Sequence, residues 1–284
     1  MFAGGRSRPS GRGRTRVASR EDSGSRPRAR AAAAASGDAP GASLPVPGWR
    51  GQRKGAASGR AKQPLSQDLI VETAIRILDA EGLDGLSMRR VAQELDTGPA
   101  SLYAHVSNKE ELLDIMFDRI CGEIALPEPD PARWREQVKE VAYAVHKVMS
   151  AHSDIARVAL GAIPTGVNSL RVNEWLLSTL LAAGIPPNVV VWGVERLFLY
   201  VNADSYEGSL HLIRRRASGL SEEEYMSGFL GQVQEFFQAL PADRFPATVR
   251  HVGPMLSPEA ADGEDRFEFG LELILRGLES YGDR

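Results

Sequence analysis

Cysteine is the scarcest informative residue in this chain, with Cys121 alone among 284 residues. One thiol cannot form an internal disulfide or a thiolate cage for a metal, and it suits a reducing compartment such as the cytoplasm. Because Cys121 falls on an apolar helical segment, we expect it to be a buried packing residue. Long apolar runs are also missing, so we expect no membrane-embedded part.

Catalytic motifs are missing as well. The sequence has no glycine loop for a phosphate, no nucleophile elbow and no HExxH pair. His146 and His152 are six residues apart, which places them on different faces of a helix and prevents a shared metal. Residues 202–206 alternate oxygen-bearing side chains but lack the glycine and terminal glutamate of a calcium loop. The sequence therefore predicts no enzyme, no metal site and no cofactor.

Residues 1–63 have little aliphatic sequence and an excess of basic residues. They hold 14 Lys/Arg and 3 Asp/Glu, whereas residues 64–284 hold 20 and 34. A segment so rich in Gly, Ser, Ala and Pro cannot bury enough apolar surface to fold, so we expect a disordered basic tail. Its role stays open between a passive extension, a start site placed too far upstream, a basic arm on DNA phosphates and an organellar transit peptide.

Strand-like alternation is absent, and helical periodicity begins at Pro64, which predicts an all-α fold. A proline-rich hinge at residues 126–131 separates an N-terminal three-helix domain with a helix-turn-helix (residues 64–125) from a C-terminal helical domain (126–284). We expect Gly82 to end the first helix and Ser107 to Glu110 to form a capping box for the fourth. The fourth helix should turn Leu113, Met116, Phe117 and Ile120 inward, and later helices should lie near 153–162, 167–183, 187–215, 221–239 and 264–281.

Residues 86–109, LSMRRVAQELDTGPASLYAHVSNK, have the pattern of two short helices joined by a tight turn. Ser87 can cap the first of these helices, and Pro99 suits the first turn of the second. With Leu102 and Val106 inward, small residues, Tyr103 and His105 are left on the outer face. This pattern indicates a helix-turn-helix, whose second helix enters the DNA major groove, rather than an ordinary helical hairpin.

The segment LSMRRVAQELDTGPASLYAHVSNKEELL resembles the N-terminal domain of TetR-type transcriptional regulators, most closely in its LYxHVxNKxxLL portion. More weakly, DRFEFGLELILRGLES resembles the closing helix of the tetracycline-repressor-like subgroup. The resemblance implies that Arg89 contacts DNA, that Tyr103 and His105 contact the backbone or a base, and that Lys109 holds a phosphate. It also implies that Pro99, Ala100 and Ser101 enter the groove.

Two features depart from that family pattern. Asp96 stands where the family usually has glycine, although Asp tolerates a left-handed conformation better than most residues. Residues 64–125 carry 5 Lys/Arg and 12 Asp/Glu, so the few cations must gather on one face. Arg89, Arg90 and Lys109 all fall in the segments expected to face DNA, and the basic tail could supply further positive charge.

The C-terminal domain has two long apolar segments, residues 187–213 and 264–281. The second has Phe267, Leu271, Ile274 and Leu278 on one stripe, widened by Phe269, Leu273 and Leu275, with Gly270 and Gly277 permitting close helix approach. So wide an apolar face suggests a partner helix, and in the resembled family these helices form a homodimer. The alternative is that they complete the core of the single chain.

The same domain should hold an effector cavity. Glu195, Leu199, Asn202 and Tyr206 share one helical face that mixes polar and aromatic groups, as ligand sites do. The alternative for each of these residues is a half-exposed stripe at an interface. We therefore predict a ligand-responsive regulator, a repressor of a palindromic double-stranded DNA operator, released by a small-molecule effector. The alternatives are control by a partner protein, or an all-helical carrier or enzyme. The candidate effector contacts are His146, Trp175, Trp192, Glu195, Phe198, Asn202 and Tyr206.

Overall fold

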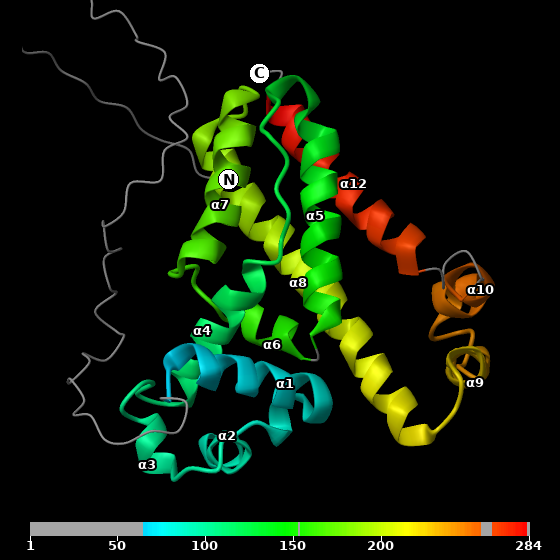
Figure 1. Cartoon of the computed structure of the whole chain (residues 1–284). Coiled ribbons are helices and arrows are strands. Elements are labelled where there is room, and N and C mark those ends of the chain that lie inside the picture. Colours follow the sequence, from blue (N-terminus) through cyan, green and yellow to red (C-terminus); the bar gives the residue numbers. More distant parts are fainter. Residues whose placement is uncertain (1–64, 153, 257–262, 283–284) are drawn as a thin grey trace, which may run out of the picture. The chain divides into compact units, whose positions relative to one another are not determined.

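The computed structural model describes residues 65–152, 154–256 and 263–282, so the predicted tail lies outside the described residues. Every regular element in that part of the chain is helical, which confirms the all-α fold (Figure 1). No described helix combines the length and apolarity needed to cross a membrane. The elements are α1 Gln67–Gly85, α2 Met88–Glu94, α3 Pro99–Leu102, α4 Lys109–Cys121, η1 Pro131–Arg133, α5 Trp134–Ala151, α6 Ile155–Ala159, α7 Val167–Ala182, α8 Pro187–Ser218, α9 Glu222–Gln238, α10 Pro246–Met255 and α12 Gly263–Gly282.

Helices α1 to α4 form the predicted helix-turn-helix unit around a small core. Ile70, Leu86, Leu102 and Leu112, one from each part of this unit, are fully buried. Ser87 caps α2 as predicted, by accepting from the Arg90 amide. Burial of this kind, rather than helix propensity, holds such short helices in place.

Two details of α4 differ from the prediction. The capping residue is Asn108 rather than Ser107, since Asn108 accepts from the Glu111 amide while the Glu111 carboxylate accepts from the Ser107 amide. The capping pair is therefore shifted by one residue. With this register Leu112 is fully buried and Leu113 is only half-buried.

The first helix breaks where glycine was expected to end it. Gly82 has a left-handed φ of 74°, and a short turn continues to Gly85. The break frees the Leu83 amide, which donates to the carboxylate of Asp154 at 3.2 Å. Asp154 itself has a φ of 58° and is buried just before α6. A strained, buried residue thus connects α1 to the C-terminal domain.

A carboxylate on α4 supplies the cap for α7. Gly166, the residue before α7, has no side chain to offer, and Asp118 accepts from the Ser169 amide at 2.8 Å and from its hydroxyl at 2.9 Å. A Cβ on Gly166 would lie 2.0 Å from the Asp118 carboxyl carbon, so glycine is required here. A negative group at a helix N-terminus also complements the helix dipole.

Helix α8 is the centre of the C-terminal domain, where it packs against α5, α6, α7 and α12 (Figure 1). The predicted helix near 153–162 is only Ile155–Ala159, and α10 was not predicted. Gly253 and Pro254 lie inside α10 and interrupt its pattern. No residue of α9 is fully buried, although several of its side chains are half-buried.

Glycine allows α12 to approach α8 closely, as predicted for Gly270. A Cβ at Gly270 would lie 2.2 Å from the Tyr200 hydroxyl oxygen, which donates to the Phe267 carbonyl at 2.9 Å. Gly277, by contrast, has open space where its Cβ would be. Only the first of the two glycines is therefore required for packing within this chain.

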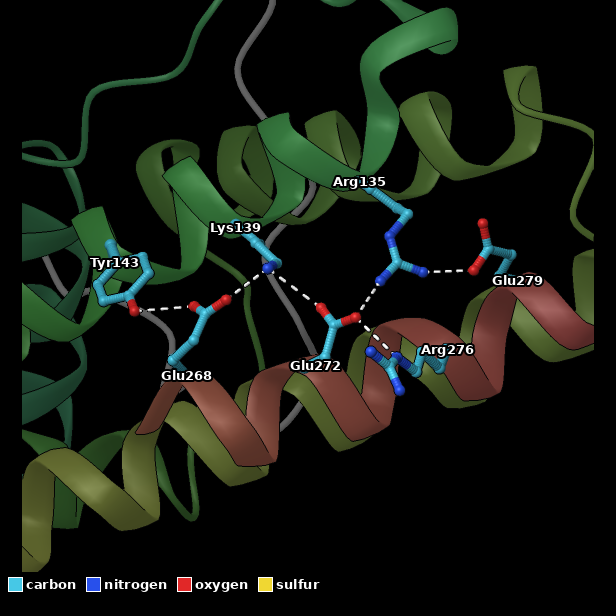
Figure 2. A network of polar contacts seen from close by, with 7 residues as sticks. All are labelled: Arg135, Lys139, Tyr143, Glu268, Glu272, Arg276 and Glu279. Atoms are coloured by element: carbon cyan, nitrogen blue, oxygen red, sulfur yellow. Dashed lines mark hydrogen bonds and ion pairs between the residues drawn. The ribbon is translucent and has the colours of Figure 1, made fainter. Parts of the chain in front are cut away.

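A network of ion pairs fastens α12 to α5 (Figure 2). Glu272 of α12 is its centre, within 2.5 Å of Arg135, 3.1 Å of Lys139 and 2.8 Å of Arg276. Hydrogen bonds from Arg276 and Lys139 lower the pKa of Glu272 from 4.5 to about 2. Lys139 likewise lowers the pKa of Glu268, which also accepts from the Tyr143 hydroxyl at 2.9 Å.

Acid should loosen this network. A carboxylate whose pKa is depressed by folding stabilises the fold above its unfolded value of 4.5 and loses that contribution as the pH falls toward about 2. The urea midpoint should therefore fall between pH 5 and pH 2, and Glu272→Gln should make that fall shallower. Glu235→Gln on the exposed face of α9 is the control. An equally steep fall in the Glu272 variant would show that the network does not cause the acid sensitivity.

Candidate DNA-binding surface and effector cavity

The turn between α2 and α3 has the predicted shape. Asp96 adopts a left-handed φ of 48°, the conformation that glycine would otherwise supply. The Thr97 amide donates back to the Ala92 carbonyl at 2.9 Å, and Pro99 occupies the first turn of α3. The chain therefore reverses tightly and presents α3 outward.

The helix α3 separates core residues from candidate DNA contacts. Leu102 and Val106 are fully buried, while Pro99, Ala100 and Ser101 are exposed. Tyr103 is 53% exposed although it is aromatic. His105 is half-buried, and its carbonyl accepts from the Gln67 side chain at 3.2 Å. Gln67 was not predicted to contribute, and it fixes the C-terminal end of α3 to the start of α1.

The three predicted DNA-facing cations differ in their surroundings. Arg89 is exposed on α2, and Lys109 lies at the N-terminus of α4. Arg90 instead pairs with Glu81 at 2.7 Å and Glu94 at 2.8 Å, and these carboxylates raise its pKa. The expectation that Arg90 joins the DNA-facing group stays a prediction, and Glu81 and Glu94 would compete with a phosphate for its guanidinium group.

A cavity of about 360 Å³ lies mainly in the C-terminal domain, within the size range of small-molecule sites. Its walls come from α4, α5, α7, α8 and the segment from α6 to Pro164. Burial raises the pKa of the Cys121 thiol to about 12, so this thiol is neutral. Its lining is mostly apolar and comprises Phe117, Cys121, Ile124, Val145, Met149, Ala159, Leu160, Ala162, Pro164, Ser169, Val172, Asn173, Leu177, Val191, Val194, Glu195, Phe198, Leu199 and Asn202.

Three of the seven candidate effector contacts line this cavity: Glu195, Phe198 and Asn202. They lie on α8 with Leu199, which the sequence placed on the same face. Many other lining residues were missed, because an apolar side chain beside a cavity has the same helical periodicity as one in a packed core.

The remaining four candidates lie outside the cavity lining. Trp175 is buried, and its ring N–H donates to the Pro127 carbonyl at 2.7 Å, which anchors the hinge. His146 bonds Asp204 at 2.9 Å beside a second, more polar hollow between α5, α8, α9, α10 and α12. Trp192 is 61% exposed, and Tyr206 is half-buried against the core.

The apolar surface of α12 divides between two faces. Phe267, Leu271 and Leu278 are buried in this chain's own core, and Ile274 packs against it. The stripe predicted for a partner helix is therefore mostly internal. Of the three residues that widened it, Leu275 is fully buried, whereas Phe269 and Leu273 are 66% and 57% exposed. Trp192 and Leu199 on α8, which packs against α12, are also exposed, and these four side chains are called here the α8/α12 outer face.

These features define a helical DNA-binding protein with a ligand-sized cavity. The profile for bacterial regulatory proteins of the tetR family matches residues 70–116, and the tetracyclin repressor-like C-terminal domain matches residues 126–281. The chain belongs to the TetR family of DNA-binding transcriptional regulators and is not an enzyme.

Several known proteins are similar over most of this chain. The transcriptional repressor DrrR1 of Streptomyces coeruleorubidus is 32% identical over 223 residues, 77% of this chain and 78% of the relative. Apo ActR from Streptomyces coelicolor superposes with a TM-score of 0.67 at 42% identity, covering 78% of this chain and 100% of that one. ActR in complex with actinorhodin gives 0.67 at 43% identity, covering 77% and 97%.

The two neighbouring arginines on α2 should have different roles, one in DNA binding and the other in stability. Arg89→Ala should weaken operator binding by roughly tenfold with an unchanged melting temperature, because its side chain is exposed and near the groove-facing helix. Arg90→Ala should lower the melting temperature by a few degrees, because Glu81 and Glu94 lose their partner. Fluorescence anisotropy and thermal denaturation of both variants check this. Equal losses of affinity would place Arg90 on the DNA after all.

Proposed function

We propose that the protein is a repressor that binds a palindromic operator as a homodimer and leaves it when a small molecule fills the cavity. The observation that carries the proposal is the position of α4. Its first residue, Lys109, is a predicted DNA contact that follows α3 in the chain, and Phe117 and Cys121 near its other end line the cavity.

The length of α4 explains how a ligand could act at a distance. Thirteen residues span about 20 Å, and a helix moves as a rigid rod. A ligand that displaces Phe117 would tilt the helix and shift Lys109. Because α1 contacts both α4 and α2, and α2 contacts α3, the tilt would also reach the α2–α3 pair. The spacing of two recognition helices in successive major grooves tolerates little change. A coupling free energy of roughly 1–3 kcal/mol is typical of such switches.

The test of DNA binding uses Tyr103. Tyr103→Ala should weaken operator affinity by roughly tenfold at unchanged thermal stability, since its ring lies outside the core. Phe236→Ala, an exposed aromatic on α9, is the matched control. Fragments flanking the protein's own gene supply the operator in a gel shift, and any compound found to bind the cavity is then added to test its release. Undiminished affinity of the Tyr103 variant would refute the assignment of α3 as the reading helix.

The homodimer is proposed on the α8/α12 outer face. Four large apolar side chains on two packed helices are more than a monomer's surface usually gathers. A self-complementary pairing across a two-fold axis would match a palindromic operator.

A charge on that face should separate the subunits. Leu273→Asp should give a monomer in sedimentation velocity with helicity retained, because Leu273 is exposed and the monomer core does not need it. Ile163→Asp, equally exposed but between α6 and α7, should remain dimeric. A Leu273 variant that sediments as the wild type would locate the interface elsewhere.

A further inference from the structure

Asn202 differs from the other polar residues buried in α8. It is 6% exposed, it lines the effector cavity, and its carbonyl oxygen has no hydrogen-bond partner among the described residues. Ser205, one turn further along, is equally buried but donates to the Val201 carbonyl at 2.9 Å. A buried acceptor without a donor is costly, and natural proteins keep few of them.

Among the described residues, two other buried side-chain oxygens have no hydrogen-bond partner, and their surroundings differ from those of Asn202. The Glu272 carboxylate lies 3.1 Å from the Lys139 ammonium and belongs to the network between α5 and α12. The Thr179 hydroxyl is not part of the cavity lining. Asn202 is therefore the described residue whose unpartnered oxygen coincides with a space for a ligand.

The charge of the cavity restricts what that ligand can be. Among the described lining residues there is no Lys, Arg or His, and Glu195 at the exposed edge is acidic. The Cys121 thiol is neutral, since burial raises its pKa to about 12. A carboxylate or phosphate would lose its hydration here and gain no cation. The apolar walls, with Phe117 and Phe198 on α4 and α8, suit an uncharged ring system.

We propose that Asn202 determines the specificity of the cavity, by accepting a hydrogen bond from a free hydroxyl group of an uncharged ligand with an apolar ring skeleton. The proposal rests on the proposed function, in which this cavity is the effector site. A site with a buried acceptor rejects an analogue that lacks the matching donor, because the acceptor is then left unpaired.

A matched set of three-ring probes tests the proposal on the full chain. The probes are 2-hydroxyfluorene, 2-methoxyfluorene, which cannot donate, and fluorene-2-carboxylate, which is anionic at pH 7. Titration calorimetry should show the wild type binding the hydroxyl probe about tenfold more tightly than the methoxy probe, as a single neutral hydrogen bond allows. The carboxylate should bind most weakly of the three.

The variant Asn202→Leu removes the acceptor at similar volume and should reduce the tenfold preference to twofold or less. Any steric effect of the methyl group persists in the variant, so the change in preference isolates the hydrogen bond. If Asn202→Leu fails to fold, Asn202→Ala removes the same acceptor without adding bulk. A tenfold preference that survives either substitution would overturn the role of Asn202.

A blocking variant separates this inference from the proposed function. Leu160→Trp adds bulk at a lining residue, and Ile163→Trp does so at a nearby exposed residue outside the lining. Loss of probe binding in the first variant alone locates the probes in the cavity. Unchanged binding in both would overturn the cavity as the effector site. A wild type that binds none of the probes would overturn the ligand class inferred here, while operator release remains the separate test of the function.

Discussion

The burial of α8 is the constraint on which the C-terminal domain depends. Val190, Val194, Leu197 and Val201 are at most 3% exposed and contact helices on several sides. Removing any of these side chains from the core would cost transfer energy and leave a void. The adjacent face of the same helix carries Glu195, Phe198 and Asn202 and does not close against its neighbours. The cavity is thus the space beside α8 that no side chain of the protein fills.

The DNA-reading unit is held to this scaffold by carboxylates. Asp154 accepts from the Leu83 amide, and Asp118 of α4 caps α7 through Ser169. Both bonds join a helix of the first unit to an element of the second, so a movement of α6 or α7 strains the position of α1 or α4. In the proposed function, this direct attachment is the route by which a ligand in the cavity would act on α1 and α4. The hinge itself is anchored by Trp175.

Much of the DNA-binding unit could be predicted from local sequence. The turn needs a left-handed residue, a proline and two inward side chains, and Asp96, Pro99, Leu102 and Val106 supply them within eleven residues. Local chemistry decides such short elements. The ion pair between Arg90 and Glu81 could not be predicted in the same way, because Glu81 becomes a neighbour of Arg90 only when α1 packs against α2.

In the C-terminal domain, sequence periodicity predicted the positions of helices but not which of their faces pack inward. Periodicity located α7, α8 and α12, but it could not tell which apolar face of α12 packs inward, since Phe269 and Leu273 are as apolar as Phe267 and Leu271. By itself, the sequence determined the helices and the helix-turn-helix motif, because both depend on residues near one another in the chain. Only the tertiary structure decided the cavity, the unpartnered oxygen of Asn202 and the cap that Asp118 gives to α7. Each of these arises between helices distant in sequence, whose contacts no local pattern encodes.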